Sequence, residues 1–98
     1  DETSIEQNSM PPAVTLSQNY PNPFNPSTEI SFSLPQEEQV TLSVFNSGEK
    51  LVKQLVNGKR PAGNHCLNFN VADLNSGVYY YTLETENTKI SKKMLLIK

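Results

Sequence analysis

Few residues in this chain are of the types that support catalysis, and their spacing does not favour it. His65 and Cys66 are the single histidine and the single cysteine of the 98-residue sequence. A thiol beside an imidazole can form a nucleophilic dyad. These two lie next to each other in a segment that alternates apolar and polar residues, and a strand points adjacent side chains to opposite faces. We therefore predict that His65 is a core or core-edge residue with a satisfied hydrogen bond, that Cys66 faces the other way, and that no residue is catalytic.

The acidic residues form no pattern typical of a metal site. Asp73 is expected to cap a single helical turn within residues 72–76. Glu37 and Glu38 are expected to be solvated residues of a turn. No second histidine, paired cysteine or calcium-loop string accompanies them. We predict neither a bound metal nor a cofactor, and the chain is not expected to be an enzyme.

Three consecutive tyrosines leave two interpretations open. Alternation places Tyr79 and Tyr81 on one face of a strand with Leu83, and Tyr80 on the other. An aromatic stripe on a sheet can stack on sugar rings, which would indicate a carbohydrate-binding module. We favour the alternative, in which Tyr79 and Tyr81 belong to the core and a hydroxyl bonds to the backbone.

A proline-rich stretch precedes the first clear strand. Each proline fixes its own φ, lacks an N–H donor and restricts the residue before it, so neither a helix nor a central strand can pass through. We predict a stiff structural corner in which the ring of Phe24 packs onto the core. The corner consists of Tyr20, Pro21, Asn22, Pro23, Phe24, Asn25 and Pro26.

The rest of the sequence predicts an all-β fold. Ile30, Phe32 and Leu34 alternate with polar residues, as in a half-buried strand. Similar segments at 40–45, 65–70, 78–83 and 90–97 predict further strands, and 14–17 a short edge strand. Residues 50–56 also favour a strand, but their apolar positions do not indicate which face is buried. Turns are expected at 35–38, 46–49, 57–63 and 86–88, with Gly48 able to adopt a positive φ. Six to seven short strands without helical periodicity indicate an antiparallel β-sandwich.

Length and charge restrict the function further. Ninety-eight residues suit one domain. A net charge of −2, from 8 basic and 10 acidic side chains, does not favour binding to nucleic acid or anionic lipid. No apolar run has the length of a membrane span. Residues 1–13 are polar and aperiodic and are interpreted as a linker from an upstream domain, with the folded domain at 14–98. No signal peptide begins at Asp1, so an exported chain would be a piece of a longer precursor.

Several strings resemble the type A C-terminal sorting domains of the type IX secretion system. Those domains end many secreted and surface proteins of Bacteroidetes and related Gram-negative bacteria. Ala62 to His65 is similar to the family's Ala-Gly-x-His turn, and the closing lysine-flanked apolar run is also similar. One departure is that Gly48 comes one place before the family's usual glycine. The strings that carry the resemblance most strongly are Gln18 to Pro26, Thr28 to Pro35 and Leu74 to Tyr81.

The resemblance implies an immunoglobulin-like sandwich that directs an attached cargo to the cell surface or the medium. The route would run through the periplasm and the outer-membrane translocon, and a sortase-like surface peptidase would cleave within residues 1–13. The alternative function is a structural spacer or carbohydrate-binding module of an extracellular protein. The residues that the resemblance assigns to recognition are Gly77, Tyr79, Lys92, Lys93, Leu96, Ile97 and Lys98.

The last predicted strand has two interpretations. Its lysines can protect a sheet edge from mispairing. They can also belong to an edge that a receptor extends with a strand of its own, and the resemblance favours this second interpretation.

Overall fold

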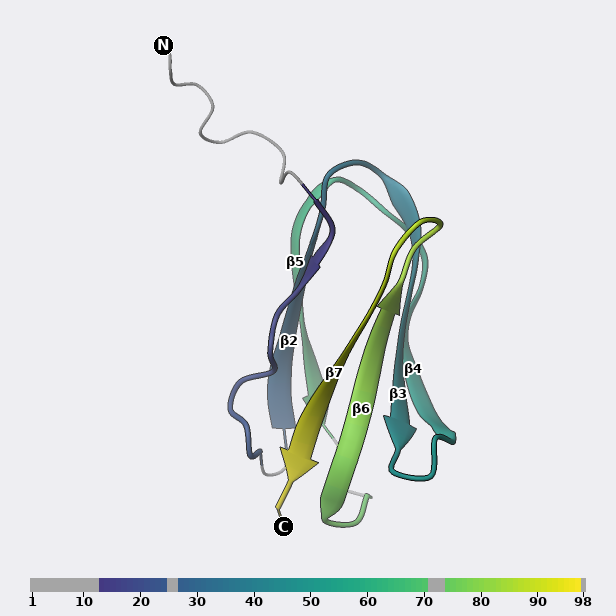
Figure 1. Cartoon of the computed structure of the whole chain (residues 1–98). Helices are drawn as coiled ribbons and strands as arrows, with labels where there is room; N and C mark the ends of the chain where they lie inside the picture. Colours follow the sequence, from purple (N-terminus) through teal and green to yellow (C-terminus); the bar gives the residue numbers. More distant parts are fainter. Residues whose placement is uncertain (1–12, 25–26, 71–73, 98) are drawn as a thin grey trace.

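Two antiparallel sheets pack face to face in the computed structural model, which describes residues 13–24, 27–70 and 74–97 (Figure 1). These residues contain no helix, so none that could span a membrane. The seven strands within them are β1 (Thr15–Leu16), β2 (Ser27–Leu34), β3 (Glu38–Asn46), β4 (Leu51–Arg60), β5 (Gly63–Asn70), β6 (Gly77–Glu84) and β7 (Lys89–Leu96).

One sheet has the strand order β1-β2-β5 and the other has the order β4-β3-β6-β7. The chain changes sheet between β2 and β3, between β4 and β5, and between β5 and β6, as in an immunoglobulin-like sandwich. The predicted all-β sandwich of six to seven strands is confirmed.

The core lies between the sheets and comes from the alternating positions. Ile30 and Leu34 of β2 face Leu42 of β3, Leu83 of β6 and Met94 of β7, and all of them are fully buried. Each such side chain contributes about 1.5–3 kcal/mol through removal from water. In β2, β3 and β6 the alternation in the sequence therefore predicted both the strand and the face that is buried.

Strand β4 pairs irregularly and is longer than predicted. Its pairing with β3 shifts register twice, so that Leu55 and Val52 have no direct partner and both pack beside the core. These bulges explain why the sequence does not show one buried face. The predicted turn at 57–63 was largely wrong, because Asn57 to Arg60 continue β4 and only residues 61–62 connect it to β5.

In the loop between β3 and β4, the residue with a left-handed backbone conformation is Glu49 and not Gly48. Glu49 has a φ of 65°, whereas Gly48 does not have a positive φ, so the expectation for Gly48 was wrong. The side-chain oxygen of Asn46 accepts hydrogen bonds from the N–H groups of Gly48 (2.8 Å) and Lys50 (3.0 Å). The backbone N–H of Glu49 also bonds to the Asn46 carbonyl (2.9 Å). These bonds fix the loop in a shape that requires a left-handed residue at position 49.

The chain enters β6 through a corner closed by a tyrosine. The Tyr79 hydroxyl donates to the carbonyl of Asn75 at 2.7 Å, four residues upstream, which is the arrangement of a tyrosine corner. Gly77 has a φ of 155°, and the space where a Cβ would lie is open. Glycine is therefore needed here for its backbone conformation and not because a neighbouring group approaches it closely. Leu74 and Ser76 lie in bends and not in the expected helical turn, and Ala72 and Asp73 lie outside the described residues.

Candidate recognition surfaces

The single histidine is a structural residue. His65 is half-buried, its Nε2 lies 2.8 Å from the carbonyl oxygen of Pro61, and its ring stacks on Phe32 with centroids 5.0 Å apart. This confirms the predicted core-edge position with a hydrogen bond. Cys66 is exposed on the opposite face, as predicted.

The environment of Cys66 does not activate the thiol. A hydrogen bond with the Glu29 carboxylate raises the pKa of Cys66, while one with Ser31 acts in the lowering direction. The thiolate is the reactive form of cysteine, and a raised pKa reduces its population. Within the described residues no three His, Cys, Asp or Glu side chains are placed to hold a metal ion.

The three tyrosines do not form a continuous platform for sugars. Tyr81 is fully buried and Tyr79 nearly so, whereas Tyr80 is 38% exposed. Burial raises the pKa of Tyr81, and the hydrogen bond from the Asn19 backbone acts in the lowering direction. Both core hydroxyls bond to backbone carbonyls, that of Tyr79 to Asn75 and that of Tyr81 to Ser17 at 2.7 Å. The predicted core role of Tyr79 and Tyr81 is confirmed.

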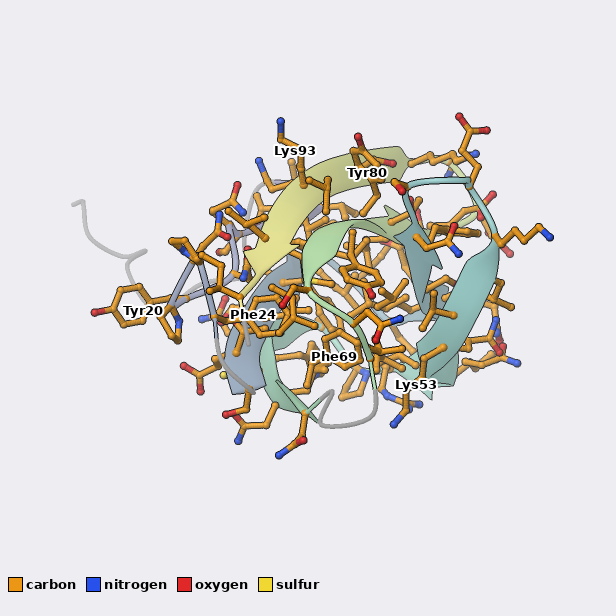
Figure 2. All side chains as sticks on the ribbon, turned by 90° about the horizontal axis from the view of Figure 1, so that it is seen from below. Tyr20, Phe24, Lys53, Phe69, Tyr80 and Lys93 are labelled. Atoms are coloured by element: carbon orange, nitrogen blue, oxygen red, sulfur yellow. The ribbon has the colours of Figure 1, made fainter. Side chains whose placement is uncertain are left out.

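The proline corner packs against the sandwich through Phe24. This side chain is 2% exposed, and its ring lies against that of Phe69 with centroids 6.4 Å apart. Tyr20 is 78% exposed and points away from the domain (Figure 2). The expectation that Phe24 joins the core is confirmed. The bonds before Pro21 and Pro23 are cis, and Asn25 and Pro26 lie outside the described residues.

A buried asparagine holds the corner from inside. Asn19 is 2% exposed. Its side-chain nitrogen donates to the Thr28 hydroxyl (2.9 Å) and to the carbonyl of Pro21 (3.1 Å), and its backbone N–H donates to the Tyr81 hydroxyl (2.8 Å). Thr28 in turn donates to the Pro21 carbonyl at 3.0 Å. A buried polar group must be bonded in this way to avoid a desolvation cost, so Asn19 fixes the path of the segment. Nothing in the sequence pattern had indicated this role.

The corner also forms backbone hydrogen bonds along the edge of β7. The N–H of Phe24 donates to the carbonyl of Leu95 (2.9 Å), and the N–H of Ile97 donates to the carbonyl of Phe24 (3.0 Å). Side chains add two more bonds, from Gln18 to the carbonyl of Lys93 (2.7 Å) and from the N–H of Leu95 to Asn22 (3.0 Å). The edge of β7 at residues 93–97 is therefore already paired. A receptor strand could pair there only by displacing residues 18–24, which corrects the expectation that this edge is free.

The residues expected to mediate recognition separate into two groups. Tyr79 (7% exposed) and Leu96 (0%) are core residues, and Gly77 shapes the entry to β6. A partner of the folded domain cannot reach the first two. Lys93 and Ile97 are exposed and Lys92 is half-buried, whereas Lys98 lies outside the described residues.

Comparison with known protein families agrees with the sequence resemblance. The family model described as "Secretion system C-terminal sorting domain" matches residues 18–98, from two residues before the proline corner through all the later strands. No curated protein and no solved structure matches the chain. A domain of this family implies a cargo joined upstream and export by type IX machinery to the cell surface or extracellular space of Bacteroidetes-type Gram-negative bacteria. The chain belongs to the C-terminal sorting domains of the type IX secretion system.

Proposed function

We propose that residues 14–98 act as an export signal that the outer-membrane translocon recognises as a folded domain in the periplasm. Residues 1–13 then form the linker to the cargo, in which a sortase-like surface peptidase cleaves. The match to the sorting-domain family over residues 18–98 carries this proposal. The domain itself is proposed to be non-catalytic and to need no cofactor.

The structure suggests a division of roles among the proposed recognition residues. Gly77, Tyr79 and Leu96 build the fold, because their side chains or conformations are committed to the sandwich. Lys92, Lys93, Ile97 and Lys98 are proposed to contact the machinery directly. Lysine ammonium groups remain solvated even when their stems pack, so their charge can be removed with little effect on folding.

A reporter fusion tests this proposal. A periplasmic reporter joined to residues 1–98 is expressed in a host that has the secretion system, and the exported fraction is measured. We expect the parent fusion to reach the surface or the medium. Replacing Lys92, Lys93 and Lys98 with Gln is expected to lower export while changing stability by no more than about 0.5 kcal/mol per exposed site.

A second triple variant provides the matched control. Lys50, Lys53 and Lys59 are all exposed, in or beside β4, and their replacement with Gln removes the same charge from another part of the surface. Export of this control should equal that of the parent. If the first triple variant also exports normally, those lysines only protect the edge. If the parent fusion stays in the periplasm, the sorting function itself is refuted.

A further inference from the structure

Exposed apolar side chains are concentrated on one end of the four-stranded sheet. The described residues include five large hydrophobic side chains that are exposed, and four of them lie on the outer face of this sheet or just beyond β7. The fifth, Tyr20, projects from the proline corner. With the half-buried Phe45 we call these four the apolar band, which consists of Leu51, Phe45, Tyr80, Leu95 and Ile97.

The strand register places members of the apolar band on the outer face of all four strands. Phe45 of β3 lies opposite Leu51 of β4 and opposite Tyr80 of β6. Tyr80 lies opposite Lys93 of β7, and the next outward position on β7 is Leu95. Ile97 follows two residues later and therefore points to the same side. Contiguous apolar surface of this kind, with polar residues around it, is typical of a protein-binding site.

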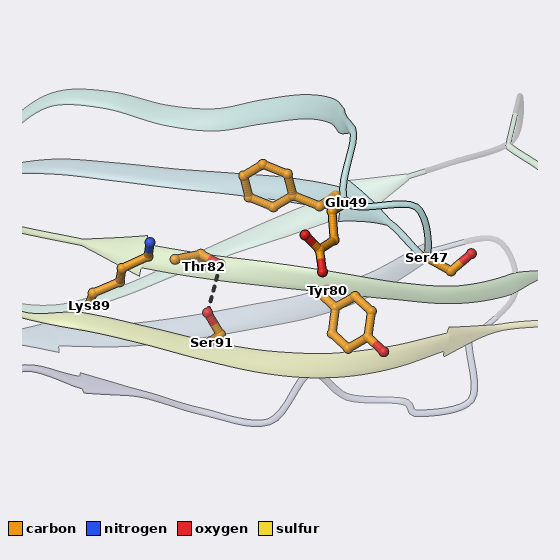
Figure 3. A pocket seen from close by; sticks show the side chains of 7 residues that line it. Ser47, Glu49, Tyr80, Thr82, Lys89 and Ser91 are labelled. Carbon is orange, nitrogen blue, oxygen red and sulfur yellow. Dashed lines mark hydrogen bonds between the residues drawn. The ribbon is translucent and has the colours of Figure 1, made fainter.

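A hollow of about 430 Å³ adjoins the band on the same face (Figure 3). Phe45 and Tyr80 form its apolar part. Its remaining lining is polar and includes the hydrogen-bonded hydroxyls of Thr82 and Ser91, which lie 2.8 Å apart. Such a hollow beside an apolar surface can receive an anchoring side chain, the type of contact that dominates binding energy.

The charges around the band favour an acidic partner. On β7 the outward position beside the band is Lys93, which lies opposite Tyr80, and residues 89–97 contain no acidic residue. Lys89 lines the hollow but lies opposite Glu84 of β6, so Lys93 is the cation that this argument uses. Glu49, at the other side of the hollow, is the one carboxylate in its lining. Electrostatic complementarity of this kind fixes the orientation of a complex and accelerates association.

We propose that the apolar band is the surface on which a protein segment of the type IX machinery docks, through an apolar anchor flanked by carboxylates. The proposal rests on the sorting function proposed above and names the surface that serves it. Docking on a sheet face also avoids the need to displace the proline corner from the edge of β7.

The test uses the same reporter fusion with changes confined to the band. Tyr80→Thr combined with Leu95→Thr removes two apolar contacts and retains residue types that favour strands. The backbone bonds of Leu95 to the proline corner are unaffected by this change. We expect export to fall about tenfold or more, as when central contacts of an interface are truncated. Lys93→Glu is expected to reduce export as well, because the introduced carboxylate would repel an acidic partner.

Two controls separate docking from other causes. Tyr20→Thr removes an exposed aromatic residue outside the band, and Val56→Ala weakens the core without altering the band. Both should export within about twofold of the parent, provided that thermal melting shows the domain still folded. Equal export of the parent and the Tyr80/Leu95 variant would overturn the proposal.

A further experiment distinguishes docking of a type IX protein from self-association through the band. The purified parent fusion is expected to sediment as a monomer. A dimer that the Tyr80/Leu95 changes abolish would mean that a second copy occupies the band, which also overturns the proposal. Failure of the parent fusion to be exported would refute the sorting function and the docking surface together, whereas normal export of both the parent and the band variant would refute the docking surface alone.

Discussion

Phe24→Ala tests whether the proline corner stabilises the sandwich. The ring of Phe24 is 2% exposed and lies against Phe69 at 6.4 Å. Truncation of a buried phenylalanine to alanine costs about 3–5 kcal/mol, because transfer free energy is lost and a cavity remains. The backbone bonds of Phe24 to Leu95 and Ile97 survive the substitution, so the segment can stay in place and we expect the lower part of that range.

The assay is equilibrium unfolding in urea, followed by circular dichroism. A loss of about 3 kcal/mol is a large part of the total stability of about 5–15 kcal/mol expected for a domain, so the midpoint should fall while the variant remains folded in buffer. Tyr20→Ala is the matched control in the same segment. Because Tyr20 is 78% exposed, its loss should change stability by less than about 0.5 kcal/mol.

A double-mutant cycle isolates the contact itself. Phe24→Ala and Phe69→Ala, made singly and together, should show a coupling of about 0.5–1.5 kcal/mol, as for other aromatic pairs. A loss below about 1 kcal/mol for Phe24→Ala would refute the reasoning. The corner would then be an exposed patch and not part of the core.

Three further predictions follow from particular bonds and side chains. Glu49→Gly should stabilise the domain by about 1 kcal/mol in the same urea assay, because glycine adopts a φ of 65° without the strain of a side chain; an unchanged or lower midpoint would contradict this. Tyr81→Phe should cost about 1–3 kcal/mol, since it leaves the Asn19 N–H and the Ser17 carbonyl without their partner. Because the pKa of Tyr81 is raised in the folded state, the stability that its hydroxyl contributes should be present in the parent below pH 10 and should be lost as pH rises further. The free energy of unfolding of Tyr81→Phe should therefore fall less steeply at alkaline pH. The purified domain should retain no stoichiometric zinc or calcium after dialysis, and elemental analysis that found either would contradict the absence of a metal site.

The sequence predicted the parts of the fold that depend on local alternation. The apolar residues of β2 and β3 stand at every second position and are buried, so the burial of Ile30, Phe32 and Leu42 could be predicted from the sequence, whereas that of Ser33 and Ser43 could not. In β4 the bulges at Val52 and Leu55 break this period, and their positions depend on pairing with β3 and not on β4 itself.

Contacts between distant segments were not visible in the sequence. Asn57 and Gly58 have the composition of a turn, but pairing with Thr41 and Val40 keeps them in a strand, so tertiary structure overrides local preference. The hydrogen bond from the N–H of Leu95 to Asn22 joins positions 73 residues apart, and no local pattern records such a contact. The apolar band was missed for a related reason, since Phe45, Tyr80 and Leu95 come from three strands whose register had to be known first.

The pairing of residues 18–24 with β7 has a consequence for the order in which the domain can be completed. The first part of the domain finds its hydrogen-bond partners on the last described strand, and contacts between such distant positions form late because long loops must close. A chain that emerges from a ribosome or a membrane pore with its N-terminus first holds an open sandwich until Leu95 and Ile97 arrive. A precursor interrupted before β7 would leave β6 paired on one side only, with β3, and the corner without its hydrogen bonds to residues 93–97. Closure of the sandwich thus requires that the chain has been synthesised and delivered through β7, and under the proposed function a cargo cut short before that point would lack the folded export signal.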